Sequence, residues 1–177
     1  MMQRKVSPTH KPLRGSGFRV QEYRGPTSSL LTHDRRPFPS LEVLYHYKVL
    51  SAPGNSMVAL KVTFPPGSST PPHTHAGAFV AVHVLTGSVL NKMNNDPMTV
   101  KNAGDSFYEA PGCRHRISDN ASESEEASII ATLMLDTETM DEIINKEGAA
   151  GLVVIDEEYR EAVKAQMEKL QAQHRAK

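Results

Sequence analysis

From residue 41 to residue 136 the chain repeats one pattern, in which short runs with apolar residues at every second position alternate with glycine or proline. In the first run, LEVLYHYKVL, this alternation places Leu41, Val43 and Tyr45 on one face of an extended strand. Similar runs are SMVALKVTF, AFVAVHVL, DPMTVK, DSFYEA and ASIIATLML. Many short strands with turn signals and no helix between them predict an all-β sandwich or barrel of antiparallel strands.

The two ends of the chain differ from this central part. Residues 1–40 carry eight basic and two acidic residues interrupted by five prolines, which predicts an extended N-terminal arm lying over its own domain or a second subunit. A basic arm that contacts a nucleic acid is the alternative. In residues 137–177, the run TETMDEIINKEG predicts a short helix that ends at Gly148. The run GLVVI is consistent with one further strand, and DEEYREAVKAQMEKLQAQHRAK predicts a longer helix. We therefore divide the chain into an extended arm (1–40), a β-barrel (41–136) and a helical C-terminal extension (137–177).

The overall composition argues against several classes of partner. Twenty Lys and Arg residues balance 20 Asp and Glu residues, so no net charge favours a nucleic acid or an anionic membrane. No apolar run approaches the ~18–20 residues that cross a bilayer. Cys113 is the single cysteine, which excludes an internal disulfide, and the N-terminus lacks the apolar segment of a secretory signal. We expect a cytoplasmic protein that binds a small molecule rather than nucleic acid or membrane.

Three histidines in the central part have a spacing that suits a metal site. In PPHTHAG, His73 and His75 are two residues apart, so on a strand they point to the same face, ~6–7 Å apart along it. Two imidazoles placed in this way can take adjacent positions on one metal ion. Two surface histidines beside a loop would have the same spacing. The third histidine, His115, follows a Pro-Gly turn in AGDSFYEAPGCRHRISDN.

The stretch around His73 and His75 resembles the first of two paired motifs of the cupin superfamily. That motif is Gly, five residues, His-x-His, three or four residues, Glu, six residues and Gly. The sequence matches it from Gly67 to Gly87 at every spacing. The one departure is Val80, which stands in the glutamate position.

The stretch around His115 is similar to the second cupin motif. That motif is Gly, five residues, Pro-x-Gly, two residues, His, three residues and Asn. Gly104, Gly112 and His115 match, whereas Ala110 stands in the proline position and Asp119 in the asparagine position. The resemblance covers roughly residues 56–136.

This resemblance implies a cupin-type antiparallel β-barrel, also called a double-stranded β-helix or jelly roll, with a divalent metal ion inside. The ion would be iron, manganese, nickel, copper or zinc, and His73, His75 and His115 fall on the three ligand histidine positions. Because Val80 cannot bind a metal, the site is similar to the three-histidine cupins, which include cysteine dioxygenases and diketone-cleaving oxygenases. A neutral ligand set leaves the metal its full charge, which favours an anionic chelating ligand such as an enolate or a carboxylate.

Glu109 is the carboxylate that we predict to take part in catalysis. It lies on the strand that leads to His115, among apolar residues, where an unpartnered carboxylate is costly to bury. Glu109 could bind the metal, orient a ligand histidine or act as a general base, and we favour the base. The alternative without a function is a carboxylate on the barrel rim, paired with Arg114 or Arg116. His83, three residues beyond Val80, is expected to face away from the cavity.

The sequence leaves two functions open. The first is a metal-dependent enzyme that acts on a small oxygen-rich organic molecule, either as a dioxygenase-like oxidoreductase or as an isomerase, cyclase or lyase working through an enolate. The second is a non-catalytic cupin that binds a metal or a ligand. An apolar lining that includes Phe64, Phe79, Ile130 and Leu133 would suit an apolar or aromatic molecule. Exposed barrel edges lead us to expect a homodimer, formed partly by exchange of residues 17–50.

Overall fold

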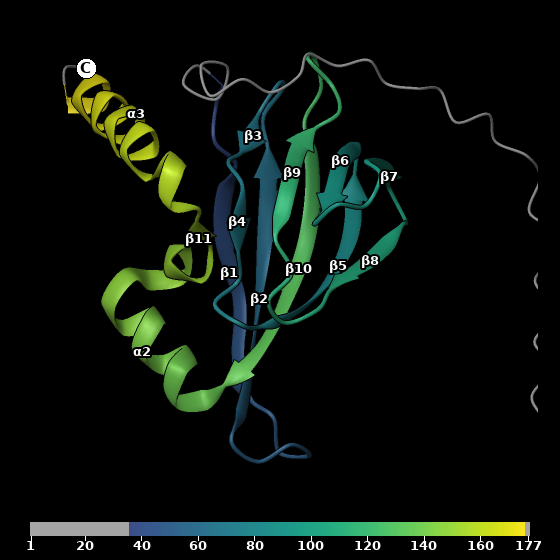
Figure 1. Ribbon diagram of the computed structural model, residues 1–177, viewed down its shortest axis with the longest axis vertical. Helices are drawn as coiled ribbons and strands as arrows, with labels where there is room; N and C mark the ends of the chain where they lie inside the picture. The colour runs from purple at the N-terminus through teal and green to yellow at the C-terminus, as the bar shows by residue number, and fades with distance from the viewer. Residues whose placement is uncertain (1–35, 176–177) are drawn as a thin grey trace, which may run out of the picture.

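The structure of the protein, a computed structural model, describes residues 36–175, and within its last helix the side chains as far as Lys169 and that of Ala172. Most of the predicted N-terminal arm, and the part of the exchanged segment before residue 36, lie outside the described residues. Figure 1 shows strands packed into a barrel, with the helices together on one side of it.

The described strands are β1 (Ser40–Lys48), β2 (Asn55–Phe64), β3 (Ser69–Thr70), β4 (His73–Thr74), β5 (Phe79–Thr86), β6 (Ser88–Met93), β7 (Thr99–Asn102), β8 (Ser106–Glu109), β9 (His115–Asn120), β10 (Ala127–Asp136) and β11 (Val154–Ile155). The helices are α2 (Thr137–Glu147), the 3₁₀ helix η1 (Gly148–Leu152) and α3 (Glu157–Arg175).

The strands form two antiparallel sheets. One has the order β1-β2-β10-β5-β8, and the other has the order β11-β4-β9-β6-β7, with β3 also paired to β9. Several neighbouring strands, such as β2 and β10 or β4 and β9, come from distant parts of the sequence, as in jelly-roll barrels. The predicted all-β antiparallel barrel with a C-terminal helix is confirmed.

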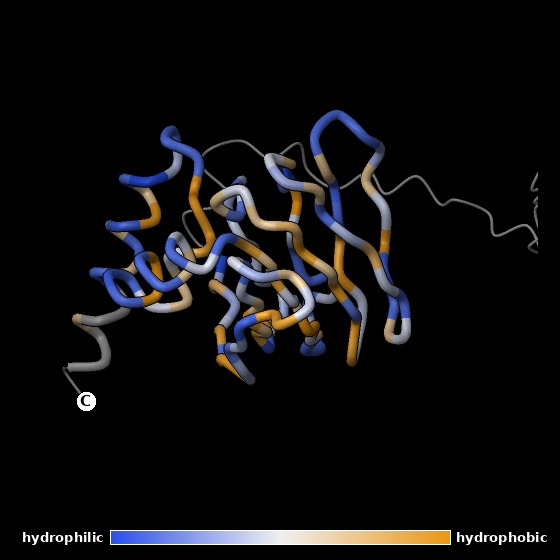
Figure 2. Tube along the Cα trace, turned by 90° about the horizontal axis from the view of Figure 1, so that it is seen from below, coloured by the Kyte–Doolittle hydropathy of each residue, from blue (hydrophilic) through white to orange (hydrophobic). Residues whose placement is uncertain are grey.

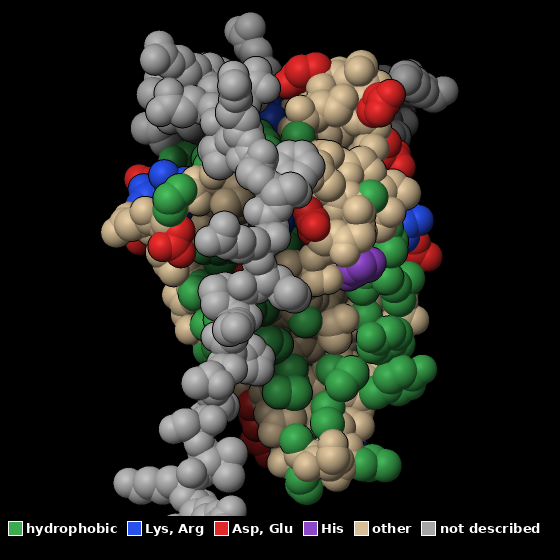
Figure 3. Space-filling model, turned by 90° about the vertical axis from the view of Figure 1, so that its right-hand side faces the viewer, with side chains coloured by type: hydrophobic (Ala, Val, Ile, Leu, Met, Phe, Trp, Pro, Cys, Tyr) green, Lys and Arg blue, Asp and Glu red, His purple; other side chains and the backbone are tan. Residues whose placement is uncertain are grey.

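Side-chain alternation along β5 shows which residues face the barrel interior. Val80, Val82 and Val84 are buried, whereas the intervening residues are exposed. Figure 2 shows the hydrophobic positions concentrated along the strands of the barrel. The expectation that Phe79 lines the barrel is wrong, because alternation turns it outward, where it is 38% exposed and stacks on Tyr108. Figure 3 views the molecule from the β7 and β8 side and shows hydrophobic side chains gathered at the surface.

On β10 the prediction was wrong by one residue. Ile129 and Leu133 point into the core, whereas Ile130 is only half-buried. Ile129 and Ile130 are both isoleucines, so hydrophobicity does not tell which of them faces inward. The pairing decides, because Ile129 lies opposite Val62 and Val84, which are themselves buried.

Among the strands that were not predicted are β6 and β9 of the second sheet. β6 begins one residue after β5, and the residue between them is Gly87, with φ 67°. A Cβ atom at this position would lie 2.7 Å from the carbonyl oxygen of Glu126, so only glycine lets the backbone turn this close to its neighbour. Gly87 therefore joins two strands in different sheets that read as one run in the sequence.

The polar sequence of β9 hides its place in the core. Asp119 and Asn120 are both buried, and each is fully engaged in hydrogen bonds. The Asn120 amide donates to the carbonyl oxygens of Phe64, Pro65 and Glu125, so it holds three chain segments together. Buried polar residues with partners of this kind stabilise a strand that carries no hydrophobic alternation.

Arg36 anchors the start of the described chain to the barrel. Its guanidinium donates to Asp119 Oδ2 at 2.7 Å and to the carbonyl oxygens of Gly67 and Ser68. The other oxygen of Asp119 accepts from the Ser69 hydroxyl at 2.6 Å. The aspartate in the motif's asparagine position thus binds the incoming chain.

The C-terminal extension begins with the predicted short helix. Asp136 caps α2, because its carboxylate accepts from the Thr139 backbone N–H at 3.0 Å. Gly148 ends the helix with φ 66°, as predicted. The chain then forms η1 and returns to the barrel as β11, which pairs with β4 at the edge of the second sheet.

Candidate metal centre

The three predicted ligand histidines meet inside the barrel. His73 lies on β4 and His115 on β9, and the two residues are directly paired across these strands. His75 follows β4 by one residue, and its ring lies 4.9 Å from that of His73. One nitrogen from each of the three rings lies within 4.8 Å of those from the other two, a spacing that a single metal ion can bridge.

Two backbone carbonyls fix which nitrogen of the first two histidines faces the centre. His73 Nδ1 lies 2.8 Å from the Pro71 carbonyl oxygen, and His75 Nδ1 lies 3.1 Å from the Leu152 carbonyl oxygen. A carbonyl oxygen only accepts, so each Nδ1 carries the hydrogen and each neutral ring has its lone pair on Nε2. Ligand histidines are commonly held in this way by a second hydrogen bond, so both residues suit metal binding.

The third histidine presents an unpartnered nitrogen to the same place. Among the residues that the structure describes, His115 Nε2 is buried and has no hydrogen-bond partner. Buried polar atoms are normally satisfied, so an orphaned nitrogen beside two other histidine rings requires an explanation. A divalent metal ion bound by three imidazoles provides one, and the residues present therefore fit the metal that the motifs imply.

Burial keeps the His73 imidazole neutral. His73 is 3% exposed and His115 is 5% exposed. Burial, reinforced by the neighbouring His115 and His75, lowers the pKa of His73 to about 3. At neutral pH the His73 lone pair is thus available to a metal without competition from a proton.

The structure brings Glu109 into the same centre. Glu109 ends β8 and lies directly opposite Val80 of β5. Its Oε2 is 3.3 Å from His75 Nε2, and its Oε1 is 3.4 Å from His115 Nδ1. Burial opposes ionisation of this carboxyl, but its contacts with His115 and His75 outweigh burial and hold the pKa of Glu109 well below its usual range.

The alternative of a rim carboxylate is wrong. Glu109 is only 4% exposed. The two arginines proposed as its partners bind elsewhere, since Arg114 pairs with Asp156 and Glu158, and Arg116 donates to Asn95.

His83 lies outside the centre, as expected. It is exposed on β5, pointing opposite to Val80, and its Nδ1 is 2.9 Å from the Ser106 hydroxyl. This histidine provides a natural control for the other three.

Sequence reasoning missed the contribution of the C-terminal extension. Leu152, whose carbonyl oxygen accepts from His75 Nδ1, is the last residue of η1. Ile155 of β11 lies opposite His73. The Asp156 backbone N–H donates to the Pro72 carbonyl at 2.9 Å, and the Asp156 carboxylate pairs with Arg114, next to His115. A backbone carbonyl has no signature in the sequence, so only the strand-like run GLVVI pointed to this segment.

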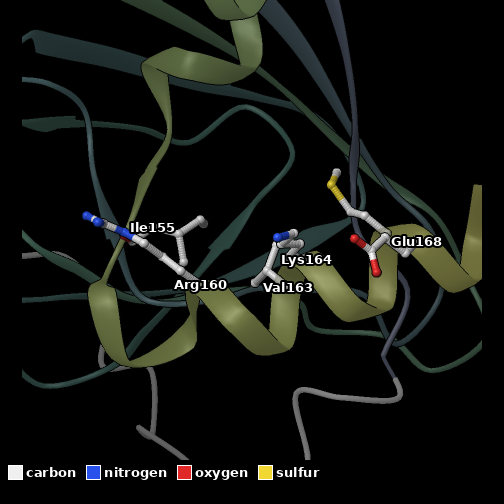
Figure 4. A pocket seen from close by; sticks show the side chains of 6 residues that line it. Ile155, Arg160, Val163, Lys164 and Glu168 are labelled. Carbon is white, nitrogen blue, oxygen red and sulfur yellow. The ribbon is translucent and has the colours of Figure 1, made fainter.

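Two surface grooves lie near this extension. One, of about 430 Å³, runs along α3 and is lined by Ile155, Arg160, Val163, Lys164, Met167 and Glu168 (Figure 4). The other, of about 590 Å³, is lined by Arg114, Asp156, Glu157 and Glu158. The three histidines line neither groove.

Residues 60–133 match the family described as the cupin domain. Together with the barrel and the two motifs, this match identifies a cupin domain in residues 60–133 of the chain. The comparison with curated proteins found no match.

Several solved structures are similar to the chain in fold. A conserved protein with a double-stranded β-helix domain from Klebsiella pneumoniae is 18% identical, covers 64% of this chain and 92% of its own, and has a TM-score of 0.47. A cupin 2 conserved barrel protein from Salinispora arenicola is 21% identical, with coverages of 62% and 85% and a TM-score of 0.45. An oxalate oxidase in complex with the substrate analogue glycolate is 21% identical, with coverages of 70% and 76% and a TM-score of 0.43. Likenesses at this level do not assign an activity.

Within residues 36–175, no helix has the length and apolar character needed to span a bilayer.

Proposed function

We propose that this protein is a metal-dependent cupin enzyme that acts on a small, oxygen-rich organic molecule. The observation that carries the proposal is the meeting of three histidine rings, from two separate motifs, in a buried part of the barrel. The side chains of His73, His75 and His115 would hold the ion. A divalent metal in such a site acts as a Lewis acid toward a substrate oxygen, or binds dioxygen.

Glu109 is the residue that we propose moves a proton in the reaction. Its Oε2 has no hydrogen-bond partner among the described residues and faces the centre beside His75. A carboxylate in this place can accept a C–H proton from a substrate, and the electron pair left behind is then delocalised as an enolate. This chemistry is common to isomerases, cyclases and lyases, and it prepares a substrate for oxygenation.

The closed surroundings favour a second candidate, a non-catalytic cupin that binds a metal or a small ligand. His73, His115 and Glu109 are each at most 5% exposed. A substrate must therefore displace the residues that cover the centre, whereas a metal ion alone needs less space.

Metal reconstitution followed by two reaction assays tests these candidates. The protein freed of metal is loaded in turn with iron, manganese, nickel, copper and zinc, and we expect close to one ion per chain. Each form is then given enolisable 2-oxo acids and β-diketones. Oxygen uptake would identify an oxygenase, and deuterium exchange at the acidic carbon without oxygen would identify enolate chemistry. Metal binding without either activity would favour the non-catalytic cupin, and no metal binding would exclude the enzyme and leave only a cupin that binds a small ligand.

We further propose that the protein is a cytoplasmic homodimer. β1 is an edge strand of its sheet, and Leu41, Val43, Leu44 and Tyr47 on it are exposed. Exposed apolar edge strands favour pairing with a second chain. We expect light scattering at micromolar concentration to show a dimer that survives deletion of residues 1–15, and a monomer would contradict the proposal.

A further inference from the structure

We infer that Glu109 gives the metal centre the carboxylate ligand that Val80 cannot give, and does so from the neighbouring strand. This inference rests on the proposed three-histidine metal site. It assigns the ligand set as three imidazoles and one carboxylate, with the carboxylate moved from the first motif stretch to the second.

Strand pairing makes this exchange of position possible. Val80 on β5 and Glu109 on β8 are directly opposite each other. Directly opposed residues of an antiparallel pair point to the same side of the sheet. Val80 is 1% exposed and Glu109 is 4% exposed, so both side chains enter the barrel interior. A carboxylate at either position therefore approaches the histidines from the same wall.

The surroundings of Glu109 Oε2 suit a bound metal ion. The Leu152 carbonyl oxygen accepts from His75 Nδ1, which leaves Nε2 as the nitrogen that faces Oε2, 3.3 Å away. An imidazole nitrogen and a carboxylate oxygen this close together can be adjacent ligands of one metal ion. Oε2 also has no hydrogen-bond partner among the described residues. A metal ion held by these two side chains would satisfy the oxygen.

The other oxygen holds the side chain in place. Oε1 lies 3.4 Å from His115 Nδ1, which leaves Nε2 of this ring directed at the centre. If Glu109 only oriented a histidine, Oε1 would be enough, and Oε2 would not need to approach a second ligand. Glu109 thus links two of the ligand histidines while one oxygen remains free for the metal.

A Glu109 ligand changes the expected net charge of the metal centre. Three imidazoles alone leave a divalent ion at its full charge, whereas an added carboxylate reduces the net charge by one. A substrate that binds through the metal would displace Oε2, and the released carboxylate would then be positioned as a base. Ligand and base are in this way successive roles of one oxygen.

Titration with Co²⁺ tests the inference, because its visible absorption reports the ligands themselves. Four chains are compared: wild type, Glu109→Gln, the exchange Val80→Glu/Glu109→Val, and Glu42→Gln as a control on exposed β1 at the opposite edge of the same sheet. We expect Glu109→Gln to weaken Co²⁺ binding by about 10–100-fold and to change the visible spectrum. The exchange variant should recover most of the affinity and the wild-type spectrum, and Glu42→Gln should match wild type.

Each outcome bears on the inference. Weaker binding by Glu109→Gln with an unchanged spectrum would mean that Glu109 only orients His115, and would overturn the ligand role. Wild-type affinity together with a wild-type spectrum would overturn it as well. Thermal unfolding of the metal-free chains shows whether a variant has failed to fold, in which case the exchange variant decides. Failure of the wild type to bind Co²⁺ would instead contradict the proposed metal site.

Discussion

The two motif stretches of the barrel contribute differently to the same centre. The first, from Gly67 to Gly87, brings two histidines and a valine where the cupin motif has glutamate. The second, from Gly104 to Asn120, brings one histidine and a buried glutamate at a position for which its motif names no residue type. The first stretch lacks the carboxylate ligand of its motif, and the second keeps its ligand histidine. Together they place three imidazoles and one carboxylate in the interior of the barrel.

This difference shows that the position of a site residue in a barrel is defined by strand pairing as much as by motif spacing. Val80 and Glu109 are 29 positions apart in the sequence but directly paired between β5 and β8. A motif describes residues along one strand, so it does not register a carboxylate on the next strand. Substitutions in each stretch test what it contributes to the centre.

The largest effect is expected from removing a histidine of either stretch. His73→Ala and His115→Ala should each lower metal occupancy more than any other change, because each removes one of only three imidazoles at the centre. His83→Ala is the matched control, since His83 is exposed and bonded to Ser106. Elemental analysis after reconstitution measures the result, and a metal-loaded His115→Ala chain would show that the second stretch is dispensable.

A second carboxylate in the first stretch should destabilise the metal-free barrel. Val80→Glu would bury a carboxylate directly opposite Glu109, and an uncompensated buried charge costs about 3 kcal/mol or more. We expect the midpoint of thermal unfolding to fall without metal and to recover when metal is added, because the ion attracts both carboxylates. Val80→Thr, of similar size and uncharged, is the control. Equal unfolding midpoints for Val80→Glu and wild type would contradict the shared interior.

Acid should destabilise the metal-free protein through His73. Its pKa is about 3 in the folded state, below the ordinary value of 6.5, so below pH 6.5 the unfolded chain binds a proton that the folded chain does not. The stability contributed by neutral His73 is complete above pH 6.5 and decreases as the pH falls toward 3, by up to about 1.4 kcal/mol per pH unit.

Urea unfolding at a series of pH values measures this decrease. In His73→Gln the slope between pH 6 and 4 should be smaller, while His83→Gln should keep the wild-type slope. An unchanged slope in His73→Gln would show that other groups cause the acid sensitivity.

The smallest effect is expected from the C-terminal extension, which belongs to neither stretch. A Cβ atom on Gly151 would lie 2.8 Å from Glu147 Cβ and 2.9 Å from Ile143 Cγ2, so Gly151→Ala should shift η1 and the Leu152 carbonyl that it carries. We expect metal affinity to fall by about tenfold, as when a partner of a ligand histidine is disturbed. Ala150→Val, on the exposed side of the same turn, is the control. Unchanged affinity in Gly151→Ala would show that His75 does not need this hydrogen bond.

The sequence by itself determined the barrel and the histidines. Alternation of apolar residues marked β2, β5 and β10, which have buried and exposed faces, and the turns between strands carry glycine or proline. The spacing of His73 and His75 and the turn before His115 were enough to predict the three ligand positions, because these features are local. Glu109 could be identified as a candidate site residue, because a carboxylate among apolar residues is unusual. The sequence did not distinguish between its roles as a metal ligand, a positioning residue and a general base.

Only the tertiary structure decided what depends on contacts between distant segments. The pairing of Val80 with Glu109 follows from the register of β5 and β8, and the orientation of His75 follows from a carbonyl 77 residues later. The polar strand β9 was not recognisable because its stability comes from hydrogen bonds such as those of Asn120 rather than from hydrophobic alternation. Local sequence patterns indicate which face of a strand is buried. The partner of each buried group depends on how distant segments pack in the folded chain, and here such partners, Glu109 and the Leu152 carbonyl, lie at the histidine centre.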